Sequence, residues 1–331
     1  MRKKFLNLIF VLIVVICTPV YMGAQNANEC VYLGGFVMGF DVKLRGANVL
    51  ALSDVVTDNG IYSPSRDAGI ICGDVIESVN GVDITCAFDI TKSLKDYKEG
   101  KVVVKIKRGE QQMIKEVEPK KDVSGRYKLG VFVKDGVEGI GTMTFIKNDG
   151  SFMALGHPIC DEKGCSCNVS GGSVYACSVY DVEKGRRGRA GELKGLVVSS
   201  DLLGNVSGNL SQGIKGNLKK DYDYKKLKSV ELGEGAVGSA ELVACVEGTE
   251  PKNYSISIVK VDLNEKNNKN YVIKVEDQRL LELTGGIVQG MSGSPILQNG
   301  KLIGAVTHVF INDSARGFGI SVQNMMNAMN E

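Results

Sequence analysis

Residues 271–310 read YVIKVEDQRLLELTGGIVQGMSGSPILQNGKLIGAVTHVF, and this stretch contains the main signals for the fold. Residues 271–275 alternate apolar and polar side chains, and residues 302–310 form a longer apolar run, as strands do. Turn residues separate such runs here and elsewhere in residues 127–331. Only residues 322–329 show a helical pattern in this region. The sequence therefore predicts a mainly β protein, built as a barrel or a sandwich.

The overall composition is that of an ordinary globular protein. The chain has 331 residues, of which 43% are hydrophobic and 24% charged, so it has room for roughly two domains. The net charge of +2 gives no electrostatic reason to expect nucleic acid as a partner.

The N-terminal segment, residues 1–25, has the features of a membrane anchor. Arg2, Lys3 and Lys4 precede an uncharged run over residues 5–22, which is just long enough to span a bilayer. A cleavage site made of small residues is poor here, so we expect a retained anchor, with a cleaved signal peptide as the alternative. In either case we expect the rest of the chain to be membrane-anchored or secreted, outside the cytoplasm.

Residues 32–119 predict a small domain of their own. The stretch AGIICGDVIESVNG, residues 68–81, resembles the corresponding stretch of PDZ domains, which are α/β domains that bind peptides. In that comparison Val37, Met38, Gly39 and Phe40 take the place of the carboxylate-binding loop, where free N–H groups meet a peptide end. The alternative is a small β domain in which Asn-Gly is only a hairpin turn. Residues 120–126 are polar and predict a linker to a second domain, residues 127–331.

Two serines in QGMSGSPI, residues 289–296, are candidate nucleophiles. Glycines flank Ser292 and permit a strained turn in which the backbone N–H groups of Gly290 and Ser292 converge on an oxyanion. Ser294 precedes Pro295 and is thereby restricted to extended conformations, so Ser292 is the better candidate. The alternative is a tight turn between buried strands, since Gly-x-Ser-Gly alone is a weak motif.

A serine nucleophile needs a base, and the chain has two histidines. His157 follows an apolar strand and precedes a proline, so we expect it at a strand end. His308 lies inside an apolar strand and should face a core, and we therefore favour His157 as the general base. The third group should be a carboxylate that holds the imidazole. Asp161 and Asp277, which follows the strand at residues 271–275, are both candidates, and spacing does not choose between them.

From residue 136 onward the chain resembles the stage IV sporulation protein B peptidases, a family of serine peptidases with chymotrypsin-like organisation. The resemblance rests on FMALGHPICD, EKGRRGRAGELKG, GFGI and the long block VIKVEDQRLLELTGGIVQGMSGSPILQNGKLIGAVTHVFIND. Matched position by position, it implies that His157, Asp277 and Ser292 form the catalytic triad. It also implies a chymotrypsin-like β-barrel peptidase domain that needs no cofactor.

The resemblance further implies a narrow function. Such peptidases cleave themselves and then cut a membrane-associated regulator during endospore formation, in the space between mother cell and forespore, which activates a late sigma factor. The expected partners are therefore this protein substrate, the chain itself and the membrane. Two other functions remain open: an inactive anchored PDZ scaffold, and a general quality-control protease.

Cysteines are dense directly after His157. Cys160, Cys165, Cys167 and Cys177 could hold zinc, but their spacing lacks the paired C-x2-C pattern of structural zinc sites. We therefore predict no metal. Because the segment is expected outside the cytoplasm, disulfides are favoured, with free thiols as the alternative.

Overall fold

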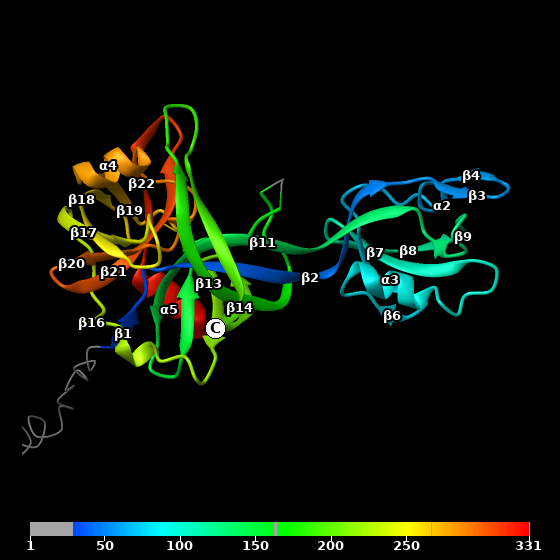
Figure 1. Cartoon of the computed structure of the whole chain (residues 1–331), viewed down its shortest axis with the longest axis horizontal. Helices are drawn as coiled ribbons and strands as arrows, with labels where there is room; N and C mark the ends of the chain where they lie inside the picture. The colour runs from blue at the N-terminus through cyan, green and yellow to red at the C-terminus, as the bar shows by residue number, and fades with distance from the viewer. Residues whose placement is uncertain (1–28, 162–163, 266, 331) are drawn as a thin grey trace, which may run out of the picture.

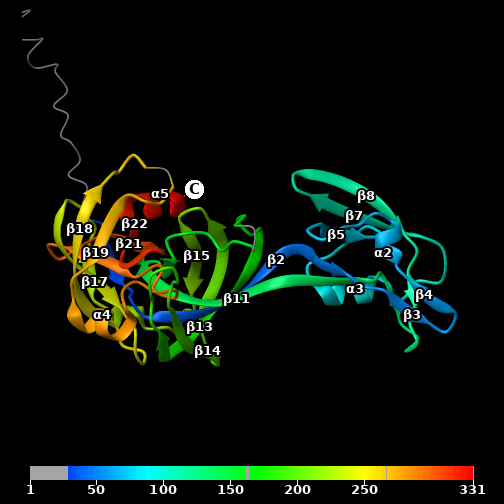
Figure 2. The ribbon, with the colours of Figure 1, turned by 90° about the horizontal axis from the view of Figure 1, so that it is seen from above.

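The computed structural model describes residues 29–161, 164–265 and 267–330, which form two bodies joined by two long strands (Figure 1). These strands are β2 (Val37–Leu52) and β11 (Val131–Ile146), and they cross between the bodies side by side (Figure 2). The expected membrane anchor, residues 1–25, lies outside the described residues. Within the described ranges, no helix has the length and apolar character needed to cross a bilayer.

The other elements divide between a larger and a smaller body. Those of the larger body are β1 (Cys30–Leu33), β12 (Ser151–Ala154), β13 (Val169–Glu183), β14 (Glu192–Leu210), β15 (Gly213–Leu218), η1 (Tyr224–Lys226), β16 (Ser229–Glu231), β17 (Gly238–Ala244), β18 (Lys252–Val261), β19 (Tyr271–Val275), α4 (Gln278–Thr284), β20 (Pro295–Gln298), β21 (Lys301–Phe310), β22 (Asp313–Ser321) and α5 (Val322–Asn330). Those of the smaller body are β3 (Val55–Thr57), β4 (Gly60–Tyr62), α2 (Pro64–Asp67), β5 (Val75–Val79), β6 (Val82–Asp83), α3 (Ala87–Ser93), β7 (Val102–Arg108), β8 (Gln111–Val117), β9 (Lys120–Lys121) and β10 (Tyr127–Lys128).

Six strands of the larger body close into a barrel in the order β17-β18-β19-β22-β21-β20. Side chains alternate along each strand, so Leu242, Ile256 and Ile273 are buried inside while polar neighbours face outward. The two strands predicted within residues 271–310 are β19 and β21 of this barrel. The expectation of a mainly β fold with a barrel is therefore confirmed.

A first ring of six strands precedes this barrel in the chain. β2 pairs with β13 on one edge and with β11 on the other, and β12, β15 and β14 complete the circuit. Met38, Met143 and Phe152 belong to its buried core and expose none of their surface. The larger body thus contains two antiparallel six-stranded rings.

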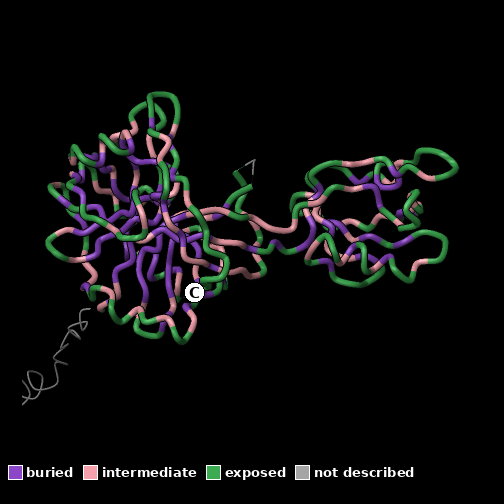
Figure 3. Tube along the Cα trace, viewed as in Figure 1, coloured by how far each residue is buried: buried purple, intermediate pink, exposed green. Residues whose placement is uncertain are grey.

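The smaller body is inserted into the larger one and does not simply precede it. β2 starts in the first ring and ends in the smaller body, where it pairs with β5, and β11 makes the return crossing. The expected boundaries, 32–119 and 127–331, therefore differ from the structure. Residues 30–44 belong to the larger body and residues 127–135 to the smaller one. Buried residues gather separately in the two bodies (Figure 3).

The predicted carboxylate-binding loop is wrong. Val37, Met38, Gly39 and Phe40 form the start of β2 in the first ring, where all four pair with β11 and the last three also pair with β13. A strand that is paired on both edges has no row of free N–H groups to offer a peptide. Pairing with segments more than a hundred residues away decided the position of these residues.

Residues 120–126, which we expected to be a linker, instead form a hairpin within the smaller body. β9 pairs with β10, and the Asp122 carboxylate accepts hydrogen bonds from the N–H groups of Ser124 and Arg126 at 2.9 and 3.0 Å. Asp commonly stabilises turns by bonding to the backbone two residues ahead. The polar composition of this segment therefore marks a turn and not a connection between domains.

A buried ion pair supports the smaller body. The Asp74 side chain has no exposed surface, and its two oxygens accept hydrogen bonds from the Arg108 guanidinium at 2.7 and 2.8 Å. One oxygen also accepts the Ile71 N–H at 2.9 Å. Burial alone would raise the pKa of Asp74, but the bonds from Arg108 and Ile71 outweigh it and hold the pKa below its usual value. This charged contact joins the loop before β5 to the end of β7.

We predict that Asp74→Asn lowers the free energy of unfolding of the smaller body by about 2–3 kcal/mol, because it leaves Arg108 without its counter-charge. The difference in free energy of unfolding between wild type and Asp74→Asn should be largest at neutral pH. It should shrink as the pH falls through the depressed pKa of Asp74, because the wild-type carboxyl then becomes protonated as well. Urea unfolding of the full chain at several pH values measures both effects.

Lys101→Ala is the control, because its ion pair with Glu116 is exposed on both sides and should contribute less than about 1 kcal/mol. Equal losses in the two variants, or an Asp74→Asn effect that grows toward acid pH, would contradict the assigned role of Asp74.

Candidate active site

The serine loop, residues 289–296, lies between the segment after α4 and strand β20, against the first ring. Gly290 and Gly293 have φ angles of +94° and +93°, which other residues rarely adopt. A side chain at position 293 would also stand 2.2 Å from the Thr142 carbonyl oxygen and 2.5 Å from the Leu155 backbone nitrogen. Glycine is therefore needed at 293, because β11 and the end of β12 approach the loop this closely.

Ser292 and Ser294 stand in different surroundings. Ser292 is half-buried, and its Oγ donates a hydrogen bond to the Thr307 carbonyl oxygen at 3.0 Å. Ser294 has no exposed surface, and its Oγ lies 3.5 Å from the Thr142 hydroxyl. A nucleophile must be reached by its substrate, so the geometry favours Ser292 over Ser294.

The backbone of the serine loop also supports the expected oxyanion hole. Among the described residues, the N–H groups of Met291, Gly293 and Ser294 donate to carbonyl oxygens, whereas those of Gly290 and Ser292 donate to no protein group. Unpaired N–H groups beside a serine hydroxyl are what stabilises a developing oxyanion. This arrangement supports the role predicted for Gly290 and Ser292 without testing it.

Two buried threonines of β11 hold the serine loop in place. The Thr142 hydroxyl donates to the Gly290 carbonyl oxygen at 2.8 Å, and the Thr144 hydroxyl donates to that of Gly293 at the same distance. The Thr142 N–H also donates to the Ser292 carbonyl oxygen at 2.9 Å. Sequence reasoning missed these residues, because a threonine in a strand gives no sign of its long-range partner.

His157 stands just beyond the end of β12, as predicted. The two residues before it, Leu155 and Gly156, have φ angles of +70° and +72°, a conformation that is strained for leucine and common at functional sites. Its Nδ1 lies 2.9 Å from the Pro158 carbonyl oxygen. Because a carbonyl only accepts, Nδ1 carries the proton and Nε2 is the basic nitrogen. Burial lowers the pKa of His157, and the bond to Pro158 opposes this shift.

The expectation that His308 faces a core is wrong. Its side chain is exposed, and its ring lies 5.1 Å from that of His157, measured between centroids, at an interplanar angle of 39°. Burial of part of the ring, together with the nearby His157 and Lys269, lowers the pKa of His308 to about 4, so the ring is neutral at pH 7. Ser292 donates to the backbone carbonyl of Thr307, the residue directly before His308, so the serine loop and the histidine pair lie against the same stretch of β21.

Asp277, by contrast, is not brought to His157. It caps the N-terminus of α4, and its carboxylate binds the Arg279 guanidinium at 2.8 Å. These bonds lower the pKa of Asp277 to about 2. Val272 lies level with His308 across β22, and Asp277 lies five residues further along, or about 16 Å at the rise of a strand. The role that the resemblance gives to Asp277 stays a prediction. Asp161 accepts the Cys165 N–H within the cysteine loop.

Residues 131–135 of β11, beside α3, form a free strand edge. The sequence analysis had placed the peptide-binding segment at Val37 to Phe40 instead. Residues 131–135 of β11 pair only with β2 within the described chain, which leaves their second edge without a strand partner. This part of β11 contacts α3, where the Ala87 N–H donates to the Asp135 carboxylate at 2.6 Å. It has the free edge that peptide addition requires, and that the start of β2 lacks.

Cys160, Cys165, Cys167 and Cys177 are free thiols in this structure, so the disulfides expected among them are not present. Burial is the main cause that raises the pKa of Cys160, Cys167 and Cys177, which disfavours the thiolate form at neutral pH. No group of three or more potential metal ligands occurs within the described ranges.

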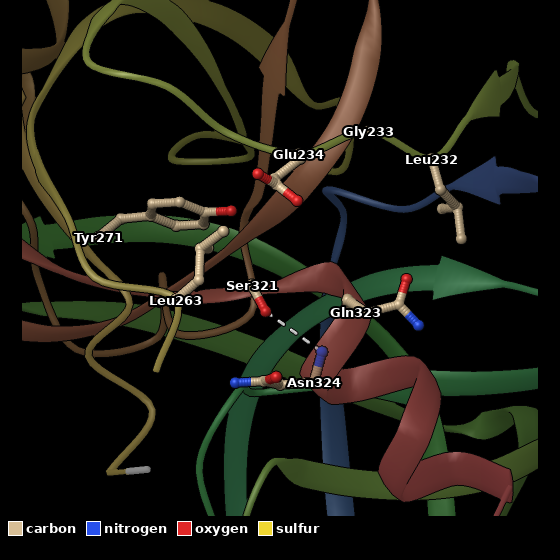
Figure 4. Close-up of a pocket in the computed structure, with 8 residues that line it drawn as sticks. All are labelled: Leu232, Gly233, Glu234, Leu263, Tyr271, Ser321, Gln323 and Asn324. Carbon is tan, nitrogen blue, oxygen red and sulfur yellow. Dashed lines mark hydrogen bonds between the residues drawn. The ribbon is translucent and has the colours of Figure 1, made fainter. Parts of the chain in front are cut away.

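A pocket of about 380 Å³ lies at the start of α5 (Figure 4). Glu234, Tyr271 and Asn324 are among the residues that line it, and the Ser321 hydroxyl accepts the Asn324 N–H at 3.2 Å across its wall. None of the predicted catalytic residues lines this pocket.

Solved structures show low similarity to the chain. The Rv3671c protease in an inactive form is 13% identical over 58% of this chain and 83% of that one, with a TM-score of 0.33. The active form from M. tuberculosis is 14% identical over 60% and 74%, also at 0.33. The PDZ domain of the SdrC-like protein (Lmo2051) from Listeria monocytogenes is 19% identical over 28% and 90%, at 0.23. A comparison with curated proteins gave no match.

The family comparison is more extensive. The family described as SpoIVB peptidase S55 matches residues 125–326, which is more than half of the chain. This range contains His157, Ser292 and both of the rings described above, apart from the strand β2. The chain therefore belongs to the SpoIVB peptidase S55 family.

Proposed function

We propose that this protein is an exported serine endopeptidase of narrow specificity in which Ser292 is the nucleophile and His157 the general base. The observation that carries the proposal is the serine loop itself. It presents the one accessible hydroxyl of the pair Ser292 and Ser294 beside two unpaired N–H groups, and the bond from Nδ1 of His157 to the Pro158 carbonyl leaves Nε2 as the basic nitrogen of that ring.

In the proposed mechanism the Ser292 hydroxyl turns from the Thr307 carbonyl toward His157 and attacks the scissile carbonyl carbon. Its proton passes to Nε2 of His157, while Nδ1–H stays bonded to the Pro158 carbonyl. The N–H groups of Gly290 and Ser292 stabilise the oxyanion, and His157 then gives its proton to the leaving amine. Water repeats the sequence on the acyl-enzyme. No step requires a cofactor.

The more specific function is proposed from membership of the SpoIVB peptidase S55 family. Membership supports self-cleavage and cutting of a membrane-associated regulator during endospore formation, with the enzyme held at the membrane by its N-terminal segment and located between mother cell and forespore. The free edge of β11 beside α3 is where we propose that a segment of the target, or of the chain itself, is recruited.

Ser292→Ala should abolish self-cleavage and labelling by a fluorophosphonate probe while the protein stays folded, because the hydroxyl makes a single hydrogen bond. Ser294→Ala is the matched control and should keep labelling, since its hydroxyl is buried away from substrate. Intact mass and circular dichroism report cleavage and folding. Labelling of Ser292→Ala at the wild-type rate would rule out the assigned nucleophile, and failure of the wild type to react would favour the inactive scaffold.

Thr142→Val should lower the rate of probe labelling about tenfold, because the Gly290 carbonyl loses its donor and the adjacent N–H groups shift by a few tenths of an ångström. Thr142→Ser restores the hydroxyl and should recover most of the rate. Thr57→Val, at a half-buried hairpin threonine in the smaller body, should have no effect. Equal rates for the Val and Ser variants at position 142 would show that the hydroxyl is not needed.

Phe132→Glu should slow self-cleavage several-fold while leaving probe labelling unchanged, if the β11 edge recruits a peptide. Phe132 is 63% exposed on that edge, so the change should not affect the core. Ile61→Glu, at an equally exposed position on the β4 hairpin, serves as the control. A parallel fall in cleavage and labelling would point to damage of the catalytic site instead of lost recruitment.

A further inference from the structure

His157 and His308 form a ring pair that the mechanism above does not use. Their centroids lie 5.1 Å apart, and the chain contains no other histidine. We propose that His308 is a positioning residue, whose ring holds His157 in the orientation and tautomer that a general base needs. This inference rests on the proposed function. It gives a second imidazole the holding role that a carboxylate has in a Ser-His-Asp triad.

A β-bulge places His308 in this position. On β21, Val306 pairs with Gly319 and His308 with Phe318, so Thr307 is the extra residue between them. Bulges disturb the alternation of side chains and often re-aim them next to active sites. Here Thr307 points inward and is buried, while the next side chain, that of His308, is turned out toward His157.

The same bulge provides the contact of the nucleophile. The Thr307 carbonyl oxygen accepts the hydrogen bond from the Ser292 hydroxyl at 3.0 Å. Gly156, directly before His157, also lies against this point, since a side chain there would stand 3.0 Å from the Thr307 methyl group and 3.3 Å from the Val306 carbonyl oxygen. Thr307 and His308 are consecutive residues of β21. Thr307 contacts Ser292 and lies against Gly156, and the His308 ring lies beside that of His157.

The charges around the pair fit a neutral holding group. Lys269 lies 5.0 Å above the Phe318 ring and its charge helps to lower the pKa of His308, and no carboxylate among the described residues contributes to the pKa of His157. When Ser292 gives its proton to Nε2, the positive charge on His157 is shared through Nδ1–H with the Pro158 carbonyl. A neutral His308 adds no repulsion at that moment, and its flat ring restricts rotation of the imidazolium until the proton reaches the leaving amine.

The first test reads the tautomer of His157 directly. Untagged full-length protein with Ser292→Ala, labelled with ¹⁵N in histidine, gives signals from only two rings, and the His308 variants leave one. We expect His157 to show Nδ1–H alone with His308 present and a mixture of both tautomers in His308→Ala. His308→Phe keeps a flat ring and should retain the single tautomer. Asn312→Ala, in the exposed turn after β21, should change nothing.

The second test measures reactivity with a fluorophosphonate, resolved into the maximal labelling rate and the half-saturating probe concentration. His308→Ala should lower the maximal rate about a hundredfold and change the half-saturating concentration less than threefold, because the base is misplaced while the binding surface remains. His308→Phe and added imidazole should each restore part of the rate. Should His308→Ala fail to fold, His308→Gln, which fills the space without a ring, replaces it in both tests.

Two results would overturn the inference. One is a single Nδ1–H tautomer for His157 in folded His308→Ala, and the other is labelling within threefold of the wild type. An Asp277→Asn loss at least tenfold larger than that of His308→Ala would assign the holding role to Asp277. In each of these cases, loss of labelling in the Ser292→Ala variant still supports the proposed function. A failure of the His308 inference is therefore distinguishable from a failure of the proposed function.

Discussion

The pairing of β2 with β11 is the constraint on which the rest of the structure depends. It closes the first ring and carries the chain into and out of the smaller body. At its larger-body end, β11 provides Thr142 and Thr144, whose hydroxyls fix the carbonyls of the serine loop. At its other end, the same strand forms the free edge beside α3. One strand therefore connects the free edge beside α3 to the serine loop.

Local features of the fold were predictable from the sequence. The strand at residues 271–275, the Asn80-Gly81 turn and the C-terminal helix follow from periodicity and turn chemistry, which depend on near neighbours only. The position of Val37 to Phe40 was not predictable in this way. Their pattern suits a loop before a strand equally well as a ring strand, and only partners about a hundred residues away distinguish the two.

The candidate site likewise has features that were predictable from the sequence and features that were not. The glycines around Ser292 indicated a strained turn, and the proline after His157 indicated a strand end, because both are local backbone effects. The bulge at Thr307 has no such marker, since Val-Thr-His-Val reads as an uninterrupted strand. His308 was therefore assigned to a core that it does not enter. Asp277 illustrates the converse, as its spacing matched the family while its carboxylate caps α4.

The insertion of the smaller body also affects how the polypeptide can fold. If the smaller body were unfolded, the ring segments of β2 and β11 would have to find each other across a flexible loop of roughly a hundred residues. A folded insert that already holds its two ends together shortens the effective loop to about ten residues, which reduces the entropy cost of closure by about 2 kcal/mol. Long-range pairings of this kind usually slow folding. The smaller body would then act as a built-in template, formed from local contacts first, on which the first ring of the peptidase closes.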